Sequence, residues 1–292
     1  MTEIDRICLI SGATSGIGRA AALELASSGF KIIVLGRDET RCLETVNAIV
    51  SANPEPERLQ PDHFVADLSS YKDIVRVACQ IKEKYDRIDV LINNAGAIFT
   101  SDRKSVDGIE LTWALNHFGY FWLTTELLEL LVKGSAPRII NVSSRAHVRA
   151  RIKDMVNIVD SKTDWFFTYS NTKLANIWFT IELADRLKEK GITVNCLHPG
   201  VVATRFGRGS GPGAIMLQTF ATIFGVTPEK GAETIVYLAR SPVVEGVTGK
   251  YFVNKKAVEP SLLALDIASA KRLWQVSAEK SDELSIALLR YN

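Results

Sequence analysis

Two residues suited to proton transfer lie four positions apart in the segment Tyr169-Ser-Asn-Thr-Lys173. In a helix this spacing places both side chains on one face. A phenol is a poor base at neutral pH because its reference pKa is about 10, but a neighbouring ammonium group favours the phenolate. Lowering that pKa by about three units requires roughly 4 kcal/mol of differential stabilisation. By itself the spacing is frequent by chance, and a solvent-exposed helix face then explains it better.

Other polar residues follow the predicted strands. The pair Ser143-Ser144 follows the run Arg138–Val142, and Asn93–Gly96 begins where the run Val90–Asn93 ends. Pro199, Gly200 and, slightly further on, Thr204 follow the run Thr193–His198. Turn chemistry explains one such coincidence, since Ser, Asn and Gly favour strand ends, but it does not explain all of them together. Ligands of open α/β sheets bind at the carboxyl ends of strands, so the sequence predicts a site there.

A glycine-rich turn, Ile10-Ser-Gly-Ala-Thr-Ser-Gly-Ile-Gly18, connects the first predicted strand to the first predicted helix. Gly12, Gly16 and Gly18 let the backbone turn tightly and approach a pyrophosphate at the amino end of the helix. A plain tight turn is the alternative. The strand–turn–helix context favours a dinucleotide site, with the spacing GxxxGxG in place of GxGxxG.

The end of the second predicted strand indicates which dinucleotide binds. A carboxylate there bonds the ribose hydroxyl of NAD, whereas an arginine suits the 2′-phosphate of NADP. Gly36 supplies no acid, Arg37 offers a guanidinium group, and Asp38 precedes a helical run that it is expected to cap. The sequence therefore favours NADP(H), with NAD(H) as the alternative cofactor and a solvated surface charge as the alternative role of Arg37.

Short β-branched runs alternate with helical patterns along the whole chain, which predicts a parallel sheet with helices on both faces. We expect one domain over residues 1–292, with an α/β, Rossmann-type, doubly wound fold. The predicted strands are 7–10, 31–35, 63–66, 90–93, 138–142, 193–198 and 250–253. The predicted helices include 18–28, 71–84, 111–131, 174–190, one beginning at Pro228, and one over 264–280. Asn116 lies inside the predicted helix 111–131, where a polar side chain indicates a specific role.

Composition excludes several classes of protein. The 292 residues carry a formal net charge of +2 and are 47% hydrophobic, which argues against disorder and nucleic-acid binding. No signal peptide and no apolar run of about 18 residues is apparent, so we expect no membrane span and a cytoplasmic location. The four cysteines form no CxxC pair and are expected to be buried free thiols, with a disulfide framework as the alternative. The four histidines have no ligand spacing, so no metal site is expected; His147 lies either at a substrate cleft or in an exposed loop.

These motifs together resemble the short-chain dehydrogenase/reductase family. Its TGxxxGxG motif is matched by Ser11–Gly18, with serine in place of the first threonine, and its NNAG motif by Asn93–Gly96. The resemblance implies a catalytic tetrad of Asn116, Ser144, Tyr169 and Lys173. The implied cofactor-binding residues are Gly12, Ser15, Gly16, Ile17, Gly18, Arg37, Asp67, Leu68, Asn93, Ala95, Gly96, Tyr169, Lys173, Pro199, Gly200, Val202 and Thr204. Ser15 departs from the basic residue that NADP-dependent relatives often carry there.

The chain is more specifically similar to the retinol dehydrogenase and WW-domain oxidoreductase branch. The segments Asn116–Thr124, His198–Val202 and Ala270–Ser277 carry this likeness, as does the 25-residue interval from Ser144 to Tyr169. In this family a substrate loop follows the sixth strand, here residues 203–227. Its apolar part, Gly213–Phe224, is expected to form a lid over a hydrophobic substrate, with a buried helix as the alternative; such a segment is also able to touch a membrane surface.

The resemblance implies reversible hydride transfer between NADP(H) and a carbonyl/alcohol pair. Tyr169 exchanges the substrate proton, Ser144 holds the substrate oxygen, Lys173 binds the nicotinamide ribose, and Asn116 supports a proton-relaying water. Two other functions stay open. One is a non-catalytic sensor of NADP, which does not need both Tyr169 and Lys173. The other is a sugar-nucleotide epimerase or dehydratase. The resemblance also leaves open a homodimer or homotetramer.

Overall fold

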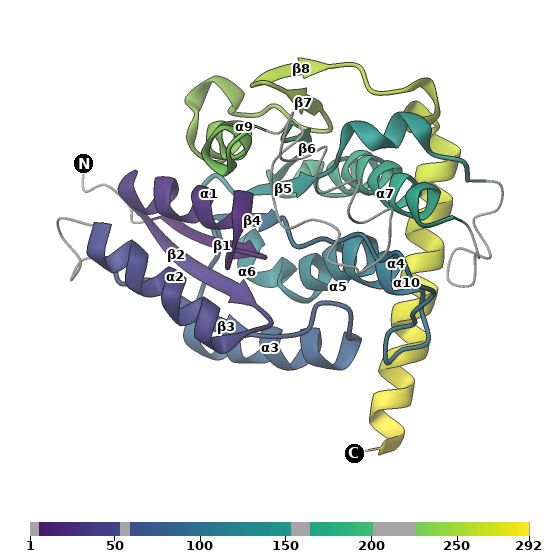
Figure 1. Ribbon diagram of the computed structural model, residues 1–292, viewed down its shortest axis with the longest axis horizontal. Coiled ribbons are helices and arrows are strands. Elements are labelled where there is room, and N and C mark those ends of the chain that lie inside the picture. Colours follow the sequence, from purple (N-terminus) through teal and green to yellow (C-terminus); the bar gives the residue numbers. More distant parts are fainter. Residues whose placement is uncertain (1–5, 53–58, 153–163, 201–225, 292) are drawn as a thin grey trace.

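The computed structural model describes residues 6–52, 59–152, 164–200 and 226–291. Its centre is one sheet with the strand order β3-β2-β1-β4-β5-β6-β7-β8 (Figure 1). The strands that pair in parallel are β1 (Arg6–Ser11), β2 (Phe30–Gly36), β3 (Asp62–Val65), β4 (Val90–Asn93), β5 (Arg138–Val142), β6 (Thr193–His198) and β7 (Tyr251–Val253). The strand order reverses at β1, which creates the edge where such sheets bind ligands. The predicted Rossmann-type α/β fold is confirmed.

Helices cover both faces of this sheet. One face carries α1 (Gly16–Ser27), α2 (Glu39–Ala52) and α9 (Pro228–Arg240); the other carries α3 (Tyr71–Lys84), α5 (Gly119–Glu126) and α7 (Trp165–Arg186). Alternate residues of β1 therefore enter different cores: Cys8 and Ile10 pack toward α1, whereas Leu9 packs toward α3. Strands buried on both faces must be apolar at successive positions, as these are.

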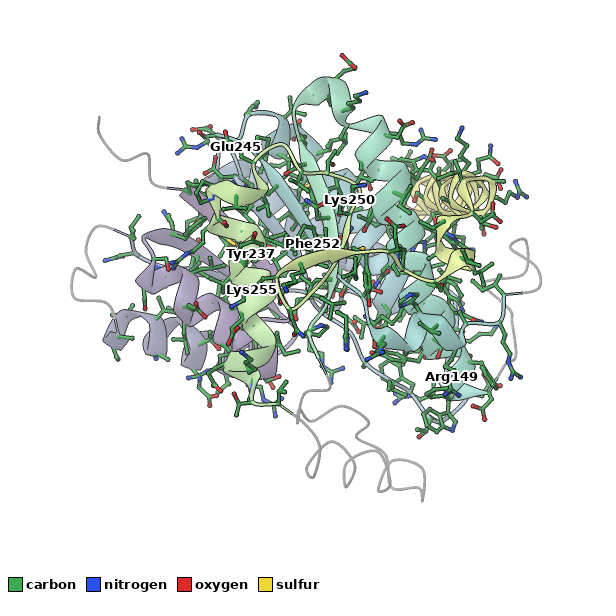
Figure 2. All side chains as sticks on the ribbon, turned by 90° about the horizontal axis from the view of Figure 1, so that it is seen from above. Arg149, Tyr237, Glu245, Lys250, Phe252 and Lys255 are labelled. Carbon is green, nitrogen blue, oxygen red and sulfur yellow. The ribbon has the colours of Figure 1, made fainter. Side chains whose placement is uncertain are left out.

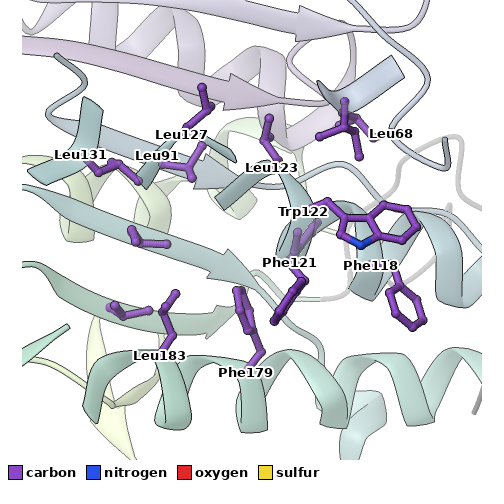
Figure 3. Close-up of a cluster of buried hydrophobic side chains, with 14 of the residues drawn as sticks. Leu68, Leu91, Phe118, Phe121, Trp122, Leu123, Leu127, Leu131, Phe179 and Leu183 are labelled. Carbon is purple, nitrogen blue, oxygen red and sulfur yellow. The ribbon is translucent and has the colours of Figure 1, made fainter. Parts of the chain in front are cut away.

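The larger core joins α5 and α7 through aromatic rings. Figure 3 shows Phe121 of α5 beside Phe179 of α7, with ring centroids 5.7 Å apart. Trp274, on the last helix α10 (Ile267–Tyr291), packs edge-on against Phe121 at 4.9 Å and stacks on Phe179 at 6.1 Å. The helix predicted over 264–280 begins later in the structure, at Ile267, and is longer, because it continues to Tyr291. It covers the outer side of α7, as Figure 1 shows.

The last strand, β8 (Lys256–Val258), was not predicted and runs antiparallel to β7. The two residues of the connecting turn, Asn254 and Lys255, have φ of 49° and 64°, as a tight hairpin turn requires. Lys255 holds this turn on α9, because its Nζ contacts a Glu233 carboxylate oxygen at 2.8 Å (Figure 2). The strand is short and exposed, so its sequence carries no alternation of apolar residues to announce it.

The predicted helical stretch 111–131 is helical over nearly its whole length, but the structure divides it into several turns and helices. A short turn α4 (Leu111–Trp113) leads into a π-helical turn η1 (Ala114–Phe118), then α5, then α6 (Leu128–Val132). The π turn carries Asn116, and such turns are frequent at functional sites. Gly119 follows directly, where an added Cβ would lie 2.6 Å from the Leu68 carbonyl oxygen. The irregular stretch therefore results from local contacts that hydrophobic periodicity does not reveal.

Helix α7 starts earlier than predicted, at Trp165, where the Asp164 side chain accepts a hydrogen bond from Phe166 N at 2.9 Å. Tyr169 and Lys173 are consequently well inside a capped helix. The helix predicted to begin at Pro228 is confirmed, with that proline in its first turn. Three of the free cysteine thiols, those of Cys8, Cys42 and Cys196, are buried, whereas Cys79 is exposed.

Candidate active site

Tyr169 and Lys173 lie in one buried cluster beside the carboxyl end of β5. The Lys173 ammonium nitrogen is 5.6 Å from the centre of the Tyr169 ring and 5.7 Å from that of Tyr120. It donates a hydrogen bond to the Val142 carbonyl oxygen at 3.0 Å. The two groups therefore share one helix face and one environment, as the spacing predicts.

Burial dominates the acid–base behaviour of this pair. It raises the pKa of Tyr169 to about 12, although the hydrogen bond from Ser144 acts in the opposite direction. It also lowers the pKa of Lys173 to about 7. In the protein alone, the cost of desolvating both charges is therefore the larger effect. That the ammonium and an oxidised nicotinamide together lower the phenol pKa stays a prediction.

The two adjacent serines at the end of β5 have different partners. Ser143 is buried, and its hydroxyl donates to the Lys173 carbonyl oxygen at 2.7 Å. Ser144 is partly exposed, and its side chain hydrogen-bonds the Tyr169 phenol. Ser143 thus fixes the backbone of α7, while Ser144 faces the acid–base pair. This geometry supports Ser144 as the substrate-binding serine.

Asn116 uses its carboxamide to fix the segment after β4. Its Oδ1 accepts from Ala97 N and its Nδ2 donates to Ala97 O, both at 2.9 Å, and Nδ2 also donates to Thr172 Oγ1 at 3.2 Å. Gly96 lies against it, since an added Cβ would meet Asn116 Oδ1 at 3.1 Å and Lys173 Nζ at 3.5 Å. A side chain at position 96 would therefore crowd Asn116 and touch Lys173, two of the tetrad residues. The water-holding role of Asn116 stays a prediction.

The two asparagines that end β4 do different work. The Asn93 side chain is buried and donates to Thr124 Oγ1 and Asn141 Oδ1, each at 2.9 Å. Its role in binding the cofactor stays a prediction. Asn94, which the sequence analysis did not select, donates to the Ser11 and Gly12 carbonyl oxygens at 3.0 and 3.2 Å. It locks the glycine-rich turn to β4.

The glycine-rich turn fits a phosphate group. The amino end of α1 begins after Ser15, whose side chain makes no capping hydrogen bond to the first helical N–H groups. Those groups are free to bind an anion. Gly12 has φ of 67°, and an added Cβ would lie 2.8 Å from Ala95 Cα. An added Cβ on Gly18 would collide with Asn94 and the Gly12 carbonyl, so both positions require glycine. Gly16 opens the helix and Ile17 is buried beneath it.

The end of β2 has no room for an acidic side chain. An added Cβ on Gly36 would lie 2.5 Å from Thr14 Cγ2 and 2.9 Å from Cys42 Sγ. Arg37 is exposed next to it. Asp38 caps α2, as predicted, by accepting from Arg41 N at 3.1 Å. The cation that this edge presents to solvent is Arg37.

The remaining predicted cofactor residues surround the same edge. Asp67 is exposed, and its Oδ1 accepts from Ser69 N at 2.9 Å and Ser69 Oγ at 2.7 Å, while Leu68 is buried beside it. Pro199 and Gly200 follow β6, and Gly200 has φ of 93°. Val202, Thr204 and nearly all of the predicted substrate loop 203–227 lie outside the described residues.

Two buried histidines flank the turn that carries Ser144. His147 belongs to the 3-10 turn η2 (Arg145–Arg149) and is 3% exposed, so the alternative of an exposed loop is wrong, while its place at a substrate cleft stays a prediction. His198 Nδ1 accepts from Arg145 N at 3.2 Å, and burial lowers the pKa of His198 to about 4. In the sequence, His147 stands out because it lies three residues after Ser144.

The comparison with known proteins agrees with this geometry. A family model described as short chain dehydrogenase matches residues 6–213. The chain belongs to this family. Human retinol dehydrogenase 14 is 39% identical over 297 residues, covering 97% of this chain and 86% of that protein. An uncharacterized Mycobacterium paratuberculosis protein superposes with a TM-score of 0.75 at 27% identity, covering 95% of this chain and 93% of its own. A Pseudomonas aeruginosa RhlG/NADP complex gives 0.68 at 26%, covering 86% and 95%.

The predicted resemblance is therefore confirmed: this is a short-chain dehydrogenase similar to the retinol dehydrogenases. As such it is an oxidoreductase that binds a nicotinamide cofactor and a small substrate. In the part of the chain that the structure describes, every helix is too short or too polar to cross a membrane.

Proposed function

We propose that this short-chain dehydrogenase catalyses reversible hydride transfer between NADP(H) and a hydrophobic carbonyl or alcohol. The observation that carries the proposal is the cluster of Ser144, Tyr169 and Lys173 at the carboxyl edge of β5. It lies across the sheet reversal from a glycine-rich turn with uncapped helical N–H groups. A non-catalytic cofactor sensor has no use for this cluster.

Each residue has a role that follows from its position. Ser144 donates a hydrogen bond to the substrate oxygen, and the Tyr169 phenol delivers or removes the proton at that oxygen. Lys173 binds the nicotinamide ribose and favours the phenolate. When bound, the nicotinamide supplies or accepts the hydride and, in its oxidised form, adds a positive charge. Asn116 holds Ala97 and Thr172 in place, and so positions the segment after β4 and the helix that carries Lys173.

The proposed preference for NADP(H) rests on the end of β2. A carboxylate that selects NAD cannot replace Gly36, because Thr14 and Cys42 fill that space. Asp38 is engaged as a helix cap, which leaves Arg37 to meet a 2′-phosphate. The RhlG complex, which contains NADP, supports this choice. The hydrophobic substrate is proposed from the likeness to human retinol dehydrogenase 14, whose named substrate is an apolar alcohol.

The test is a screen of NADPH and NADH against medium-chain, aromatic and isoprenoid aldehydes and ketones. The measurement is the rate at which the cofactor is oxidised. We expect carbonyl-dependent oxidation of NADPH, and a loss of kcat of about a hundredfold or more in Tyr169→Phe. Tyr120→Phe is the matched control, because that ring also contacts Lys173 but lies outside the tetrad. Its kcat should change less than about threefold.

Three other outcomes contradict the proposal. Binding of NADPH without turnover of any carbonyl indicates a sensor. Conversion of a nucleotide sugar without net oxidation of the cofactor indicates an epimerase or dehydratase. Tyr169→Phe with substantial turnover would remove the phenol from the mechanism.

A further inference from the structure

His147 contacts the catalytic region without belonging to the tetrad. Its ring Nδ1 lies 2.8 Å from the Ser144 carbonyl oxygen, and its Nε2 lies 3.1 Å from Ser261 N. A backbone N–H only donates, so Nε2 accepts and Nδ1 carries the proton that it donates to Ser144. The two hydrogen bonds select one neutral tautomer. Burial also lowers the pKa of His147, which keeps the ring neutral.

The ring is clamped between separate parts of the fold. Tyr251 of β7 packs edge-on against it, with ring centroids 5.1 Å apart. Ser261 precedes the 3-10 turn η5 (Leu262–Leu265), which is attached to α7 by the hydrogen bond from Trp178 Nε1 to Leu263 O at 3.0 Å. His147 therefore connects the backbone of Ser144 to a chain segment more than a hundred residues away.

From this arrangement we infer that His147 is a positioning residue for Ser144. The inference rests on the proposed function. Ser144 must bond both the Tyr169 phenol and the substrate oxygen, and small displacements of such a group reduce turnover. Fixing the Ser144 carbonyl oxygen fixes the direction in which its Cβ and hydroxyl leave the backbone. The backbone N–H of His147 donates to the same oxygen at 3.1 Å, and its Nδ1–H adds a second, shorter bond, while its Nε2 holds the ring against Ser261.

Substitution of His147 by asparagine or by glutamine tests its two hydrogen bonds separately. His147→Asn keeps a donor near the place of Nδ1, whereas His147→Gln keeps an acceptor near the place of Nε2; His147→Leu keeps neither. We expect kcat to fall about tenfold in the Gln and Leu variants and to stay within about threefold in Asn. The KM for NADPH should change less than twofold in all of them, because the two hydrogen bonds of the His147 ring go to Ser144 and Ser261 and not to a predicted cofactor-binding residue.

The matched control is His63→Gln, which alters a half-buried histidine on β3, four strands away from β5 in the sheet order. It should lower the melting temperature without lowering kcat. Equal losses of kcat in the Asn and Leu variants, or unchanged kcat in Gln and Leu, would overturn the inference.

Crystal structures of the variants test the inference independently of turnover. We expect the Ser144–Tyr169 hydrogen bond to be kept in His147→Asn and lost in His147→Leu. If that bond is intact in His147→Leu, His147 does not position Ser144, whatever the enzyme's activity. If the wild type turns over no carbonyl while the bond is lost as expected, the proposed function fails and the positioning role stands.

Discussion

The Tyr169 phenol is protonated at neutral pH in the protein alone, because burial raises its pKa to about 12. Lys173, with a pKa lowered to about 7, is only partly charged under the same conditions. The two residues are positioned but not yet activated. Their proximity is a property of the helix, whereas ionisation of the phenol needs charge from a bound ligand.

The two adjacent serines provide a direct test at the residue scale. Ser144→Ala should lower kcat about a hundredfold, because the hydrogen bond to the substrate oxygen is lost. Ser143→Ala should lower kcat much less and should cost about 1 kcal/mol of stability, because it loses only its bond to the Lys173 carbonyl. Steady-state kinetics and urea unfolding measure the two effects. The reverse order of the two kcat losses would assign the catalytic role to Ser143.

Arg37 should determine the choice of cofactor. Arg37→Ala is expected to raise the KM for NADPH about tenfold, which corresponds to about 1.4 kcal/mol, and to leave the KM for NADH nearly unchanged. Arg37→Lys keeps the positive charge but loses the planar guanidinium group, which can make two parallel hydrogen bonds. Its KM for NADPH should therefore lie between those of the wild type and Arg37→Ala. An equal rise of both KM values would show that Arg37 does not contact a 2′-phosphate.

Several elements meet at the glycine-rich turn, and their packing decides its shape. Asn94 at the end of β4 bonds the Ser11 and Gly12 carbonyls, and Ala95 lies directly against Gly12. The turn is therefore part of a contact between β1, α1 and β4. The same contact places it beside Gly96 and the tetrad.

A glycine substitution separates this contact from backbone strain. Gly12→Ala must both adopt φ of 67° and displace Ala95, so we expect NADPH binding to weaken about a hundredfold. Gly29→Ala is the matched control, because Gly29 has φ of 85° with no atom within 4 Å of an added Cβ. It should lower stability by about 1–2 kcal/mol and leave binding unchanged. Calorimetric titration with NADPH measures the binding, and equal affinities of the two variants would contradict this account.

At the scale of the whole molecule, α10 closes the helical layer that carries the catalytic helix. Ser281 accepts from Trp122 Nε1 at 3.0 Å, and Ser277 Oγ lies 2.8 Å from His117 Nε2. Its Trp274 covers the aromatic rings of α5 and α7. The face of α7 beneath α10 is thereby occupied within one chain. One domain over residues 1–292 and a homodimer or homotetramer stay predictions.

Buried histidines should make the stability of the molecule sensitive to acid. Burial lowers the pKa of His117 to about 3, whereas an unfolded histidine has a pKa of about 6.5. Between these values the unfolded chain binds a proton that the folded chain does not, so stability falls as the pH is lowered from about 6.5. His117→Gln should reduce the slope of unfolding free energy against pH by up to about 1.4 kcal/mol per pH unit. Urea unfolding between pH 7 and 4 measures it; identical slopes would contradict it.

The sequence alone determined the parallel strands, the glycine-rich turn and the pairing of Tyr169 with Lys173, because strand periodicity, glycine spacing and helical spacing are local properties. The positions of Asn116 and Ser144 in the tetrad came from the resemblance to the family. Only the tertiary structure decided which serine faces Tyr169, why Gly36 excludes an acid, and that His147 is buried beside Ser144. It also decided the π turn at Asn116, the antiparallel β8 and the rise of the Tyr169 pKa. Each of these depends on contacts between segments distant in the sequence, such as Gly36 with Thr14, or on desolvation by the assembled core. Such contacts leave no periodic trace in the chain.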